Sequence, residues 1–177
     1  MKYFLKPHPV SFPISVKSVE VEITANDLCE MLLDFSIEGD NVVIPHWQSG
    51  GREDGLWKST CFELFLGTVD SEIYFEFNFS PSSGWAAYKF GKYREGMIDQ
   101  PMTVEPHLDF DPDKPLVLSV DLDLSNMPRA PLIGNLTAVI EEEGGHKSYW
   151  ALAHPAGPPD FHNRDCFIAR LPPVEAP

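Results

Sequence analysis

Cysteine and basic residues are both scarce in this chain of 177 residues. The three cysteines, Cys29, Cys61 and Cys166, are an odd number without CxxC spacing, which argues against a disulfide framework and a structural zinc site. The chain has 13 Lys and Arg against 27 Asp and Glu, a formal net charge of −14. Nucleic acids and anionic membrane surfaces are therefore not expected as partners, because both are bound chiefly through Lys and Arg.

The sequence also lacks long apolar runs. No stretch approaches the roughly 20 apolar residues of a transmembrane helix. The N-terminal run MKYFLKPHPV contains Pro7 and Pro9 and lacks the apolar segment of a signal peptide, so we expect a cytoplasmic protein. Apolar residues still make up 43% of the chain, which is enough for one folded domain at this length. We expect that domain to span residues 1–171, with 172–177 as a tail.

Apolar and polar residues alternate with period two along most of the chain, as in β-strands that bury one face. Val19, Val21 and Ile23, for example, alternate with Glu20 and Glu22. Short strands bounded by Gly, Pro and Asn predict an all-β fold, a single antiparallel β-sandwich of jelly-roll or immunoglobulin-like type with about 9–11 strands. The one weak helix candidate is 25–32, and further strands are expected at 33–38, 61–66, 73–80, 85–90, 103–110, 116–123, 135–142, 148–154 and 166–171.

Two of these strands carry polar residues on the side away from the predicted core. Alternation sends Phe62, Leu64 and Leu66 of the first strand and the Phe run of the second inward, so Glu63, Glu76 and Asn78 point to the opposite face, together with Phe65 and Tyr74. Trp57 precedes the first of the two strands. An aromatic ring beside carboxylates and an amide suits a sugar, whose C–H face packs on the ring while its hydroxyls form hydrogen bonds. The alternative is an ordinary solvated sheet face, where Glu and Asn are common.

Three runs of the sequence resemble DOMON-like proteins related to family 9 carbohydrate-binding modules, in a free-standing bacterial subgroup. They are DGLWKSTCFELFLG, YFEFNFSPSSGWAAYKFGKYREGM and YWALAHPAGPPDFHNRDCF, and the resemblance covers most of residues 45–171. It implies a β-sandwich that binds carbohydrate, without catalysis and without a cofactor. Secreted modules of that family are attached to hydrolases, whereas this sequence shows no export signal.

The same resemblance implies a set of sugar-binding residues. Family 9 modules use a Trp followed six residues later by a Glu, the spacing of Trp57 and Glu63. Alternate residues of a later strand add polar contacts, and a second Trp from a late segment completes an aromatic clamp. Arg52, in the loop REDG, is a further candidate for contact with a ligand hydroxyl. The candidate ligand-binding residues are therefore Trp57, Glu63, Glu76, Asn78, Trp150 with Trp85 as its substitute, and Arg52.

Four other functions are open to the same sequence. Glu63 and Glu76 could act as the acid and base of an enzyme on a glycan or a small metabolite. The aromatic face could instead dock a protein partner or a second copy of this chain. The loop HPAGPPDFHNRD could hold a metal through His154, Asp160, His162 and Asp165, although hydrogen bonds that fix the loop are the preferred interpretation. A haem-binding DOMON-type domain would pair Met97 or Met102 with His154 or His162.

Overall fold

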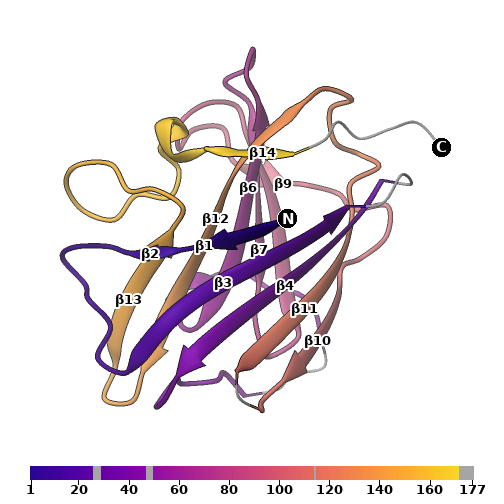
Figure 1. Ribbon diagram of the computed structural model, residues 1–177. Helices are drawn as coiled ribbons and strands as arrows, with labels where there is room; N and C mark the ends of the chain where they lie inside the picture. The colour runs from indigo at the N-terminus through magenta and orange to yellow at the C-terminus, as the bar shows by residue number, and fades with distance from the viewer. Residues whose placement is uncertain (26–28, 47–49, 114, 172–177) are drawn as a thin grey trace.

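The computed structural model describes residues 1–25, 29–46, 50–113 and 115–171, which form two packed β-sheets. The five-stranded sheet has the order β1 (Lys2–Phe4), β3 (Val16–Ala25), β4 (Glu30–Gly39), β11 (Leu116–Asp123) and β10 (His107–Asp111). The nine-stranded sheet has the order β2 (Lys6–Pro7), β13 (His146–Ala151), β12 (Leu132–Glu142), β6 (Cys61–Thr68), β7 (Tyr74–Phe79), β8 (Gly84–Phe90) and β5 (Gly51–Arg52), with β14 (Ala169–Leu171) on β12 and β9 (Ile98–Asp99) on β8. Figure 1 shows the two layers, with β3, β4 and β11 in front of β12, β6 and β7.

The main core lies between the sheets and follows the predicted alternation. Phe62, Leu64 and Leu66 of β6 face inward beside the Phe residues of β7. Phe35 of β4 meets them from the other sheet, with its ring centroid 4.9 Å from that of Phe62 and 6.4 Å from that of Phe79. The predicted all-β antiparallel sandwich is confirmed, and among the described strand pairs β5 with β8 is the parallel exception.

Some predicted elements differ in type or length. The helix expected at 25–32 is wrong where the structure describes it, because β3 ends at Ala25 and β4 begins at Glu30; residues 26–28 lie outside the described ranges. The strand expected at 103–110 begins only at His107, since Pro101 and Pro106 have no N–H for a ladder. The strand expected at 166–171 shortens to β14, after the 3-10 turn η2 (Arg164–Cys166). No helix within the described ranges is long and apolar enough to cross a membrane.

Candidate functional site

The outer face of the nine-stranded sheet brings the predicted polar residues together. In the ladder of β6 and β7, Glu63 pairs with Asn78 and Phe65 pairs with Glu76. Thr137 of β12 pairs with Glu63 from the other side. Because directly paired residues point to the same face, these side chains are neighbours on the face opposite the main core. The prediction that Glu63, Glu76 and Asn78 share one face is confirmed.

This face is covered, and its interpretation as a solvated surface is wrong at these positions. Glu63 is 3% exposed, Glu76 6% and Asn78 0%. The loop before β14 covers them, and it forms a second apolar cluster with the sheet in which the rings of Phe65 and Phe167 lie 6.0 Å apart.

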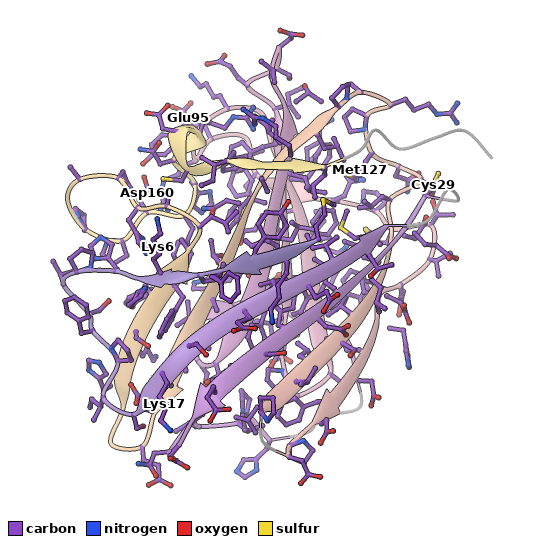
Figure 2. All side chains as sticks on the ribbon, in the orientation of Figure 1. Lys6, Lys17, Cys29, Glu95, Met127 and Asp160 are labelled. Atoms are coloured by element: carbon purple, nitrogen blue, oxygen red, sulfur yellow. The ribbon has the colours of Figure 1, made fainter. Side chains whose placement is uncertain are left out.

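The covering loop is anchored by hydrogen bonds of its residues 160–164. Arg164 donates from Nη2 to the carbonyls of Thr68, the last residue of β6, and of Ser71 after it. Asn135 Nδ2 donates to the Phe161 carbonyl at 3.3 Å. Figure 2 shows Asp160, on this loop, and Glu95 on the same flank of the molecule. Arg94, next to Glu95 in the chain, bonds Asp160 there at 2.8 Å.

A pocket of about 370 Å³ remains between the loop and the sheet. Trp57 stands at its rim, 40% exposed, on the 3-10 turn η1 (Leu56–Lys58). Gly55 starts this turn at φ 77°, a conformation that favours Gly. The Trp57 ring meets the Tyr88 ring edge-on at 6.3 Å. The pocket is lined by Trp57, Glu63, Phe65, Glu76, Tyr88, Phe90, Arg94, Met97, Val139, Tyr149, Pro159, Phe161 and His162.

Each carboxyl group of the pocket is held through one oxygen by a neutral donor. Thr137 Oγ1 donates to Glu63 Oε2 at 2.7 Å. Asn78 Nδ2 donates to Glu76 Oε1 at 2.8 Å. Asn78 is fully buried and does not line the pocket, so it orients Glu76 instead of facing a ligand.

Burial changes the protonation of both carboxyl groups. Loss of solvent, together with the charge of Glu76, raises the pKa of Glu63 to about 8. Burial also raises the pKa of Glu76, although the hydrogen bond from Asn78 and the charge of Arg94 oppose this rise. Because the charge of Glu76 opposes the ionisation of Glu63, the two carboxyl groups resist simultaneous ionisation. At neutral pH the pair therefore keeps a proton.

His162 is the neutral neighbour of this pair. The backbone N–H of Arg94 donates to the Tyr74 hydroxyl at 3.1 Å. The Tyr74 hydroxyl and His162 Nδ1 share a hydrogen bond of 2.8 Å. The other ring nitrogen, Nε2, faces Glu76 Oε2 at 3.6 Å. Burial and the charge of Arg94 lower the pKa of His162 to about 4, so the ring is uncharged near pH 7.

Besides Asn78, the structure places three more of the predicted residues away from the pocket. Trp150 pairs with Ala138 and packs between the sheets, 2% exposed. Trp85 is also in that core, 4% exposed. Arg52 lies with its guanidinium 4.7 Å from the Trp85 ring and donates to the carbonyls of Ala87 and Gln100. These three side chains stabilise the sandwich.

The aromatic residues that do face Trp57 across the pocket were not predicted. Tyr149 comes from β13, and Phe161 comes from the covering loop, with the two rings 6.2 Å apart. Tyr88 pairs with Glu76 and so shares its face. Tyr88 and Tyr149 each alternate with a core residue on their strand, and the strand pairing decides which of the two neighbours faces the pocket.

The proposed metal ligands do not converge on one point among the described residues, whereas two of the proposed haem ligands share the pocket. His154 Nε2 donates to the Lys6 carbonyl at 2.7 Å, Asp160 is bound to Arg94, and Asp165 is exposed. In the part of the chain that the structure describes, no three His, Cys, Asp or Glu side chains are placed to hold a metal. Met97 and His162 line the pocket, whereas Met102 packs against the main core.

Comparison with known proteins adds a structural similarity. No protein-family model matches the sequence, and no curated protein matches it. A crystal structure of a proposed carbohydrate-binding protein from Bacteroides uniformis ATCC 8492 superposes with a TM-score of 0.69 at 16% identity, covering 95% of this chain and 84% of that one. This similarity shows a fold shared with a protein of that description.

Proposed function

We propose that this protein binds a small carbohydrate, without converting it, in the pocket on the outer face of β6, β7 and β8. The observation that carries the proposal is that the partly exposed ring of Trp57 and two buried carboxyl groups line one pocket. The ring offers a plate for the C–H face of a sugar, and the open carboxyl oxygens accept its hydroxyl protons. A volume of about 370 Å³ lies within the usual range of ligand pockets and suits a mono- or disaccharide.

Two further features support this proposal. The solved structure with the same fold is of a proposed carbohydrate-binding protein. The resemblance to DOMON-like proteins related to family 9 modules assigns Trp57 and Glu63 to the sugar site, and both line the pocket. Membership of that family is part of the proposal. Trp85, Trp150 and Arg52 are left out of the proposed site, and Tyr149 and Phe161 take the place of the second Trp.

Replacement of Trp57 by Ala tests the proposal. We expect saturable binding when wild-type protein is titrated with a panel of mono- and disaccharides in isothermal titration calorimetry, a readout that does not depend on the Trp57 fluorophore. Trp57→Ala should weaken binding by about tenfold to hundredfold, roughly 1.4 to 2.7 kcal/mol, because it removes the stacking plate. Phe4→Ala is the matched control, since Phe4 is an exposed aromatic residue on β1 of the other sheet. Equal binding by Trp57→Ala and wild type, or no response of folded protein to the whole panel, would contradict the proposal.

Glycoside hydrolysis is the second candidate, because a buried carboxyl pair with raised pKa in a pocket is also typical of an acid–base site. Turnover separates the two candidates. Incubation of the protein with the oligosaccharides that it binds should release no reducing ends if the pocket only binds. Release that disappears in Glu63→Gln would establish hydrolysis instead.

A further inference from the structure

No Lys or Arg side chain among the described residues forms an ion pair with the carboxyl pair on the pocket floor, and Arg94 acts on Glu76 only through its charge at longer range. Thr137 and Asn78, which donate to it, are neutral. Glu63 Oε1 and Glu76 Oε2 accept no hydrogen bond in the part of the chain that the structure describes. The nearest basic side chain, His162, is uncharged near pH 7 and lies 3.6 Å from Glu76. Two acceptor oxygens of buried acids therefore remain available to whatever occupies the pocket.

Arg94 lines the pocket but its charge is already balanced. Its Nη2 donates to Asp160 Oδ1 at 2.8 Å, and the hydroxyl of Tyr93 donates to the other oxygen of Asp160 at 2.7 Å. On the opposite side, Tyr88 donates to Asp54 at 2.6 Å, which adds another acid beside the pocket. The net charge of the side chains around the cavity is therefore negative whenever Glu63 or Glu76 is ionised.

The remaining walls suit a cation. The rings of Trp57, Tyr88, Phe90, Tyr149 and Phe161 line the same cavity. Aromatic faces attract ammonium groups, more strongly where water is excluded. A protonated amine has three N–H donors and one positive charge, and so matches two open carboxyl oxygens better than a hydroxyl does. A neutral sugar would leave any ionised Glu without a counter-charge in a buried site, which is costly.

We propose that the ligand of this pocket carries a protonated amine, so that amino sugars bind in preference to their neutral parents. The inference rests on the proposed carbohydrate-binding function and names its ligand class. Binding of the cation stabilises the ionised carboxylates and so releases the proton that the pair holds at neutral pH. The titratable or charged groups that face or adjoin the pair are Cys61, Tyr74, Tyr88, Arg94, Asp160 and His162.

Isothermal titration calorimetry with matched sugars tests the inference. The probes are glucosamine, galactosamine and mannosamine, each beside its neutral parent and its N-acetyl derivative, near pH 7. We expect at least one amino sugar to bind tenfold or more tightly than both of its neutral counterparts. The apparent binding enthalpy of that amino sugar should differ between buffers of different ionisation enthalpy, because binding releases a proton to the buffer. The preference should vanish in Glu63→Gln and in Glu76→Gln and persist in Glu38→Gln, an exposed acid on β4.

The outcomes separate the two proposals. A neutral sugar that binds as tightly as its amine, with a dependence on Trp57, would overturn the amine inference and leave the carbohydrate function standing. Failure of every sugar to bind would overturn both. Thermal unfolding of the Gln variants checks that they fold. The selectivity of the wild-type protein among the amino, neutral and N-acetyl forms of each sugar tests the amine inference without any variant.

Discussion

The wild-type protein is expected to lose stability as pH rises from about 5 to about 8, and the substitution Glu63→Gln should abolish most of that pH dependence. The folded-state pKa of Glu63, about 8, lies above the ordinary value of 4.5. The folded protein therefore keeps a proton that the unfolded chain releases. The resulting stabilisation is complete below pH 4.5 and is lost as pH rises through the folded pKa. Its upper bound is roughly 5 kcal/mol, from about 1.4 kcal/mol per unit of pKa.

His162 has the opposite dependence and must be separated from this effect. Its folded pKa of about 4 lies below the ordinary 6.5, so it destabilises the folded state progressively as pH falls from 6.5 towards 4. Urea unfolding of wild type and Glu63→Gln at matched pH values cancels this common contribution. We expect the stability of the variant relative to wild type to increase steadily between about pH 5 and pH 9. Parallel stability curves would show that Glu63 titrates normally and is not buried as described.

Glu142→Ala is expected to lower the free energy of unfolding by about 2 to 4 kcal/mol. The Glu142 carboxylate accepts hydrogen bonds from the backbone N–H groups of Ile14, Ser15 and Val16 and from the Ser15 hydroxyl. These contacts fasten the segment that crosses from β2 in one sheet to β3 in the other. Alanine would leave these donors without their acceptor.

The pH dependence of the stability that Glu142→Ala loses provides a control for this prediction. Burial alone would raise the pKa of Glu142, but the hydrogen bonds from Ser15 and from its neighbouring N–H groups outweigh burial and lower it. The stabilisation is therefore present above pH 4.5 and lost as pH falls through the lowered pKa, where Glu142→Ala and wild type should converge. Glu143→Ala, an exposed neighbour, should unfold like wild type. An equal loss in both variants, measured by urea unfolding, would contradict the role of Glu142.

The strands and the shared face of Glu63 and Glu76 could be predicted because both depend on local alternation. Val19, Val21 and Ile23 show it in β3, where all three are buried. The covering of this polar face by the loop before β14 could not be predicted. It depends on contacts between a Pro-rich loop and strands about 90 residues earlier in the chain, such as that of Arg164 with Thr68. The periodicity of the sequence does not predict contacts between residues so far apart in the chain.

The residue predicted as the second aromatic wall of the site was wrong by a single position in the sequence. Trp150 was assigned by resemblance, yet Tyr149 beside it faces the pocket. Successive side chains of a strand point to opposite faces, so a shift of one residue exchanges core and pocket. The pairing of Tyr149 with Val139 and of Trp150 with Ala138 sets this register. It depends on strand pairing, which the sequence of β13 alone does not specify.

The most direct test of the carbohydrate site is a titration followed through the indole N–H signals in a ¹H–¹⁵N spectrum. Single Trp→Phe variants assign the signals of Trp57, Trp85 and Trp150. With the sugar that binds, the Trp57 signal should move and saturate, while those of Trp85 and Trp150 stay in place because both indoles are buried between the sheets. Movement of Trp85 or Trp150 with Trp57 unchanged would place the ligand elsewhere and contradict the account.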